Sequence, residues 1–140
     1  MVIVDAGVVV ALFTPDVHQD AVQTQYRSWV TAGEDRHAPA VMLYEVMNVL
    51  ARQRWDGALT PSETDSVWAN IAGLGITVHP FDPGVDGPRS LEIATTLNRR
   101  HATDCAYVSL AERLGGAVWT LDGSLARAAS AAGLPVRLLP

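Results

Sequence analysis

The chain has 140 residues, a formal net charge of −5 at pH 7, 49% hydrophobic residues and 18% charged residues. This length fits a single domain over residues 1–140 with enough apolar side chains for a substantial core. All ten Lys and Arg positions are arginine. A P-loop, which needs a lysine, is therefore excluded. The acidic balance also argues against nucleic-acid binding driven by net charge alone.

Several features bear on the compartment. No apolar run approaches the roughly 20 residues needed to cross a bilayer. The N-terminus begins on an apolar, β-branched run and lacks the basic segment and cleavage site of a signal peptide. The single cysteine, Cys105, cannot form an internal disulfide, which fits a reducing environment. We expect a cytoplasmic protein without a membrane segment.

Short β-branched runs alternate with helical patterns along the whole chain. The expected strands are residues 2–4, 36–38, 76–78, 117–121 and 136–138. The expected helices are residues 7–13, 18–31, 41–54, a helix starting at 61, then 88–99, 104–114 and 124–132. This alternation predicts an α/β fold in which helices cover both faces of a parallel sheet.

Three helices carry start signals. Thr60 is predicted as an N-cap, with Pro61 at the first helical position and Glu63 completing a capping box. Asp16 and Thr103 are predicted to cap the helices that follow them.

Four acids lie at the edges of apolar segments. Asp5 and Asp122 follow expected strands, Asp104 opens an expected helix, and Glu45 lies in the first turns of another. Ligands of parallel sheets bind at the carboxyl ends of the strands. Carboxylates are costly to bury unless something neutralises them. The four acids therefore indicate one converging site around a divalent cation.

Each acid also has a structural interpretation. Asp5 can cap the next helix, Asp104 can be a first-turn acid, and Asp122 can be a turn residue. Glu45 can belong to a solvated helical stripe, or it can line a cleft with Asn48 orienting its carboxylate.

A basic cluster, Arg99, Arg100 and His101, precedes Asp104. It fits either phosphate contacts, with His101 as a candidate base, or a solvated helix end. The remaining histidines show no metal-ligand spacing and are interpreted as structural: His18, His37 and His79.

Four segments taken together resemble the PIN-domain ribonucleases, most closely the VapC-type toxins of toxin–antitoxin modules. The segments are VDA at 4–6, YEVMNVL at 44–50, TDCAYVSLAERLG at 103–115 and WTLDGSLA at 119–126. They appear in the family's order over nearly the whole chain. One departure is Gly7, where the family usually has Ser, Thr or Asn.

The resemblance implies a PIN-like three-layer fold and Mg²⁺- or Mn²⁺-dependent endonucleolytic cleavage of RNA. Asp5 and Asp104 would be the principal metal ligands, completed by Asp122 and Glu45, with Thr120 in support. Carboxylate oxygens suit Mg²⁺ or Mn²⁺ better than zinc.

Other side chains receive supporting roles. Asn48 would help to orient Glu45, and Arg99, Arg100 and Arg27 are candidates for contacts with the RNA backbone.

The resemblance also implies a cognate antitoxin and a homodimer. Residues 16–31 and 41–54 carry apolar side chains beyond the needs of one core face, so we expect the antitoxin along these helices. The side chains are Val22, Tyr26, Trp29, Val30, Val49 and Trp55. One alternative is that these helices support the homodimer instead, and another is that Tyr26 and Trp29 are simply core.

Three other functions stay open. One is a PIN-like nuclease for RNA maturation or for DNA, outside a toxin–antitoxin module. Another is a catalytically inactive binding module. A receiver-like domain is disfavoured because it needs a lysine near its phosphorylated aspartate, and this chain has none.

Overall fold

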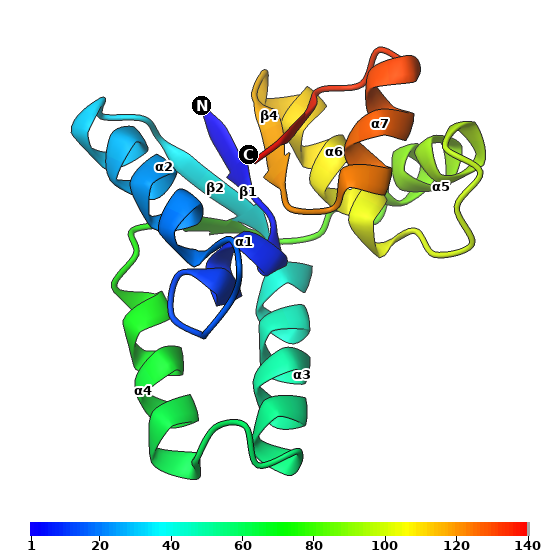
Figure 1. Ribbon diagram of the computed structural model, residues 1–140. Helices are drawn as coiled ribbons and strands as arrows, with labels where there is room; N and C mark the ends of the chain where they lie inside the picture. Colours follow the sequence, from blue (N-terminus) through cyan, green and yellow to red (C-terminus); the bar gives the residue numbers. More distant parts are fainter. Residues whose placement is uncertain (140) are drawn as a thin grey trace.

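A computed structural model describes residues 1–139 (Figure 1). Its centre is a parallel sheet of five strands in the order β3-β2-β1-β4-β5. The strands are β1 (Val2–Val4), β2 (Arg36–Pro39), β3 (Thr77–His79), β4 (Ala117–Thr120) and β5 (Val136–Leu138). The expected strands are therefore confirmed, each with bounds that differ by at most one residue.

Seven helices are present in residues 1–139. They are α1 (Ala6–Ala11), α2 (Gln19–Thr31), α3 (Val41–Trp55), α4 (Pro61–Ala72), α5 (Asp86–Thr96), α6 (Thr103–Leu114) and α7 (Gly123–Ala131). The largest departure from expectation is α5, which ends before Arg99 because Asn98 takes a positive φ of 51°. Within the same residues, no helix has both the length and the apolar character needed to cross a membrane.

The helices form layers on the two sides of the sheet, which confirms the three-layer α/β expectation (Figure 1). On one face, α2 packs Trp29 against Trp119 of β4, with ring centroids 5.3 Å apart. On the other face, α6 lies against β1, β2 and β4 and carries α5 beside it. Helices α3 and α4 lie side by side and project beyond the sheet.

The middle strand β1 is entirely buried: Val2, Ile3 and Val4 are at most 3% exposed. A parallel strand covered on both faces is apolar throughout rather than alternating, as this one is. Helix α6 is buried over most of its length, and Cys105 within it is fully buried, as expected of a small apolar side chain.

Two predicted caps are wrong. Asp16 lies too early to cap α2, whose N-cap is His18, and its carboxylate instead accepts a hydrogen bond from the His18 N–H at 2.7 Å. Thr103 is already the first residue of α6, with Ala102 at the N-cap position. A capping residue needs a non-helical backbone, so Thr103 cannot serve.

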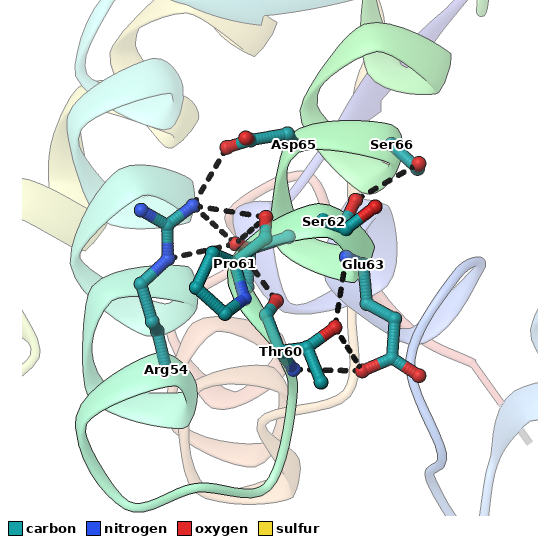
Figure 2. A network of polar contacts seen from close by, with 8 residues as sticks. Arg54, Thr60, Pro61, Ser62, Glu63, Asp65 and Ser66 are labelled. Atoms are coloured by element: carbon teal, nitrogen blue, oxygen red, sulfur yellow. Dashed lines mark hydrogen bonds and ion pairs between the residues drawn. The ribbon is translucent and has the colours of Figure 1, made fainter.

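The capping box of α4 is confirmed (Figure 2). The Thr60 N–H donates to Glu63 Oε2 at 2.7 Å, and the Glu63 N–H donates to Thr60 Oγ1 at 3.2 Å. Arg54 of α3 reaches across to this helix start, where its Nη2 lies 2.6 Å from Asp65 Oδ1. The start of α4 is thus fixed by its own box and tied to α3.

We expect Thr60→Ala to lower the free energy of unfolding by about 1 kcal/mol, because the replacement removes an N-cap. Chemical denaturation measures the change. Ser62→Ala is the matched control, since it removes an exposed hydroxyl from the same helical turn without touching the box. Equal losses in both variants would show that the cap contributes nothing of its own.

Candidate active site at the carboxyl edge of the sheet

The fold brings the four predicted acids to one edge, which we call the acid edge: Asp5, Glu45, Asp104 and Asp122. Asp5 directly follows β1, and Asp122 lies just beyond the adjacent strand β4. Glu45 and Asp104 lie in the first turns of α3 and α6. Burial raises the pKa of Glu45, and the charges of Asp5 and Asp104 raise it further, so these three carboxylates interact electrostatically.

Asp5 is held by a side chain rather than by a helix. It stands at the N-cap position of α1, but its carboxylate makes no capping hydrogen bond. Instead, the hydroxyl of fully buried Thr120 donates to Asp5 Oδ2. The same hydroxyl accepts the Asp122 N–H at 2.9 Å. Thr120 therefore links two members of the acid edge through one hydroxyl.

Glu45 is oriented by Tyr107, a residue to which the sequence assigned no role. The Tyr107 hydroxyl donates to Glu45 Oε2, and the ring is only 2% exposed. Burial, together with the nearby charges of Asp5 and Glu45, raises the pKa of Tyr107 and keeps it a donor. Its signal in the sequence is the spacing of three residues from Asp104, which places both on one face of α6. Asn48 is exposed, and no hydrogen bond in residues 1–139 joins it to Glu45.

Asp104 and Asp122 share one cation, Arg99. Arg99 Nη1 lies 2.6 Å from Asp104 Oδ2, and Arg99 Nη2 lies 3.2 Å from Asp122 Oδ2. The other Asp122 oxygen, Oδ1, caps α7 by accepting from Ser124 N at 2.8 Å and Leu125 N at 2.9 Å. The structural interpretation of Asp122 therefore holds for one of its two oxygens.

The charge at the acid edge is uneven. Burial raises the pKa of Asp5, and the charge of Asp104 raises it further, against the hydrogen bond from Thr120. Burial likewise raises the pKa of Glu45. Burial alone would raise the pKa of Asp122 too, but hydrogen bonds from Leu125 N and Arg99 leave it lowered. Within residues 1–139, neither Asp5 nor Glu45 forms an ion pair, so part of the negative charge is uncompensated.

Oxygen-only donors with uncompensated charge fit a hard divalent cation such as Mg²⁺ or Mn²⁺. Their present positions do not form a metal cage, because the described part of the chain contains no group of three or more His, Cys, Asp or Glu side chains placed to hold an ion. The donor chemistry therefore matches the expectation, whereas a ready-made four-carboxylate site is not seen.

The candidate RNA-binding arginines are separated in space. Arg99 lies at the acid edge, and Arg100 is its exposed neighbour in the chain. Arg27 lies in the second half of α2, next to Tyr26, whose hydroxyl donates to Leu74 O just before β3. Arg27 therefore lies toward the edge formed by the amino ends of the strands, opposite the acid edge.

Gly7 leaves room beside Asp5. A Cβ built there would lie 3.9 Å from Asp5 Oδ2, which is an ordinary contact. A side chain at this position would fit, so the glycine removes a possible hydrogen-bonding group from the acid edge without relieving a steric clash.

Of the apolar side chains expected on α2, only Val30 is exposed, at 53%. Val22, Tyr26 and Trp29 are core residues, at most 7% exposed. Larger exposed apolar side chains lie on α3 and α4, where Trp55 is 89% exposed and Trp68 is 39% exposed. With Met47, Leu50, Arg54 and Asp65, they line a groove of about 620 Å³, which we call the α3–α4 groove.

A family model of the PIN domain matches residues 2–131. The chain belongs to the PIN-domain family. One PIN-domain relative is ribonuclease VapC3 of Pyrobaculum aerophilum, 29% identical over 131 residues, which cover 89% of this chain and 91% of the relative.

Solved structures share the fold. VapC20 of Mycobacterium tuberculosis, described as a sarcin–ricin loop cleaving toxin, superimposes with a TM-score of 0.71 at 16% identity, over 96% of both chains. VapBC2 of Rickettsia felis, solved bound to a DNA fragment from its promoter, gives a TM-score of 0.73 at 12% identity, over 100% of both chains. At these identities, the comparison establishes the PIN fold alone.

We expect Asp5→Asn to stabilise the metal-free protein at neutral pH. Because the pKa of Asp5 is raised on folding, the folded protein binds more protons than the unfolded chain, and stability falls as pH rises through the folded pKa. Asparagine removes this penalty and keeps an acceptor for Thr120. Thermal melting in EDTA should show a gain at pH 7 that shrinks as pH falls toward the ordinary pKa of aspartate.

Exposed Asp56 provides the matched control for that series. Asp56→Asn makes the same chemical change away from the acid edge and should show no comparable gain. A lower melting temperature for Asp5→Asn at every pH would mean that the carboxylate charge stabilises the metal-free fold, contrary to the burial argument.

Proposed function

We propose that this PIN-domain protein is a metal-dependent endoribonuclease and the toxin of a toxin–antitoxin module. The observation that carries the proposal is the half-buried Asp5, which forms no ion pair within residues 1–139 and lies beside Glu45 and Asp104 at the acid edge. Carboxylate oxygens whose negative charge is not paired with a cation suit a divalent metal ion, and such an ion can support the hydrolysis of a phosphodiester. The relatives named ribonuclease VapC3 and sarcin–ricin loop cleaving toxin support the same reaction class.

The proposed chemistry needs a divalent Mg²⁺ or Mn²⁺, which would lower the pKa of a bound water and offset charge on the phosphate oxygens. Asp5 and Asp104 would hold it, with Asp122 and Glu45 completing the set. Thr120 fixes the Asp5 carboxylate, and Tyr107 fixes that of Glu45. These two hydroxyls are the protein's own means of orienting acids that would otherwise repel one another.

Substrate contacts come from the basic cluster. Arg100 is exposed beside the acid edge and could contact RNA phosphates without rearrangement. Arg99 could do so after leaving its carboxylates. Arg27 lies toward the amino ends of the strands, away from the acid edge, and could contact only RNA that extends well beyond the cut bond.

The α3–α4 groove is the proposed docking site of the antitoxin. It offers Met47 and two tryptophans for an apolar partner surface, flanked by the Arg54–Asp65 ion pair. Tryptophans in such grooves commonly carry most of the binding energy of an interface. A partner seated here would lie on helices that project from the same sheet edge as the acids (Figure 1).

The proposed homodimer has a second surface available. Exposed Tyr44, Phe81 and Leu91 surround a mostly apolar pocket of about 650 Å³ next to Thr103 and the start of α3. This surface is distinct from the α3–α4 groove, so dimer formation and antitoxin binding need not compete.

We expect the purified protein to cut RNA in the presence of Mg²⁺ or Mn²⁺, and EDTA to stop the cutting. Asp104→Asn should lower cleavage at least roughly 100-fold, because even changes outside the ligand shell commonly cost 10- to 100-fold. Total RNA with mapped cut ends is the readout, and Asp56→Asn is the control.

Full activity of Asp104→Asn would remove that residue from the site. Cleavage that persists in EDTA would remove the metal from the reaction. Cutting of DNA but not RNA would replace the toxin with the alternative nuclease.

We expect Trp55→Ala or Trp68→Ala to weaken binding of the protein encoded by a small reading frame next to this gene. A loss of about 30-fold corresponds to an interface hot spot of about 2 kcal/mol. Co-expression and co-purification provide the test, with binding titration of the purified pair. Val17→Ala is the control, since Val17 is 95% exposed and lies outside the groove.

Retained binding by both tryptophan variants would place the antitoxin elsewhere. A neighbour that neither binds nor suppresses cleavage would overturn the toxin assignment and favour a nuclease for RNA maturation.

A further inference from the structure

Arg99 is the only residue in positions 1–139 that forms ion pairs with Asp104 and Asp122. Its side chain is only 19% exposed, and its two terminal nitrogens go to different carboxylates. A guanidinium presents its N–H groups in a rigid planar fork, so one arginine can donate to two acids from two different nitrogens. Arg99 thus closes one half of the acid edge, while Asp5 and Glu45 in the other half have no ion pair among these residues.

The oxygens that Arg99 contacts belong to two of the proposed metal ligands. A divalent cation and a guanidinium offset the same charge, and they require the same lone pairs. A divalent cation bound to Asp104 Oδ2 would therefore weaken or break the ion pair between that oxygen and Arg99.

We propose that Arg99 is an internal competitor for the divalent cation, which must displace its guanidinium from Asp104 and Asp122. This inference rests on the proposed function of the acid edge. An arginine of the protein itself then sets the concentration of metal ion at which the site fills.

The local backbone allows such a release. Arg99 follows Asn98, whose positive φ prevents α5 from continuing. The Arg99 N–H donates to Ala94 O at 2.8 Å, which fixes the backbone of Arg99. The backbone can therefore stay in place while the long side chain swings away from the acids. Arg100 shares this segment, is exposed, and has no ion pair within residues 1–139.

A purely structural clamp makes the opposite prediction. If Arg99 only holds α5, α6 and α7 together, its removal disorders the acids, and metal binding weakens or stays unchanged. If Arg99 competes, its removal frees the acids, and metal binding tightens even though the metal-free protein loses two ion pairs.

The test is a direct Mn²⁺ titration of the full-length protein, by calorimetry or by the electron paramagnetic resonance signal of free Mn²⁺. Arg99→Gln should bind Mn²⁺ roughly three- to tenfold more tightly than the wild type, the range expected for losing partly exposed ion pairs. It should also show a larger rise in melting temperature at a fixed Mn²⁺ concentration. Arg100→Gln removes the same charge from the next residue, so its affinity should stay within about twofold of the wild type.

Arg99→Lys keeps the charge and should fall between the wild type and Arg99→Gln, because an ammonium lacks the planar fork that places one nitrogen against each acid. It also serves as the test if the glutamine variant does not fold, which circular dichroism will show. Mn²⁺ affinity that is unchanged or weaker in the Arg99 variants, or equally tightened in Arg100→Gln, overturns the inference.

The failure of this inference differs from failure of the proposed function. A wild type that cuts RNA with Mn²⁺, combined with no gain of affinity in the Arg99 variants, rejects the competitor and leaves the nuclease intact. A protein that neither binds Mn²⁺ nor cuts RNA, with or without Arg99, rejects both.

Discussion

The acid edge depends on the withdrawal of one carboxylate from water at the end of the middle strand. β1 is covered by helices on both faces, so Asp5, the residue that follows it, is half-buried and only partly open to solvent. Burying a carboxylate is costly, and Thr120 offsets only part of the cost with one hydrogen bond. Glu45, Asp104 and Asp122 lie at the same edge, so the negative charges there outnumber the one paired cation, Arg99.

The surrounding side chains treat the four carboxylates in two different ways. Arg99 compensates Asp104 and Asp122, while Glu45 is held by a neutral tyrosine hydroxyl and Asp5 by a neutral threonine hydroxyl. A neutral donor orients a carboxylate without cancelling its charge. On one side of the edge the carboxylates therefore keep their charge unpaired within residues 1–139, and on the other side Arg99 already pairs with both carboxylates. Proposed metal binding and the proposed competition by Arg99 follow from the same arrangement.

The sequence predicted what depends on periodicity and strand ends. The strands, the capping box at Thr60 and the positions of Asp5 and Asp122 follow from local patterns that the packing does not override. It could not predict which side of an apolar helix faces inward, so the sequence left open whether Tyr26 and Trp29 of α2 belong to a partner surface or to the core, and the fold buries both. The bond from Tyr107 to Glu45 and the bridge made by Arg99 are equally out of reach, because they join residues of separate helices whose relative placement only the fold decides.

The central claim is that the acid edge holds a divalent cation. The most direct measurement is a crystal structure grown with Mn²⁺, with diffraction recorded where manganese scatters anomalously. We predict an anomalous peak in coordination contact with the carboxylates of Asp5 and Asp104, and an Arg99 guanidinium that has moved away from Asp104 and Asp122. A protein that cuts RNA with Mn²⁺ but shows no anomalous peak at these carboxylates would contradict the account.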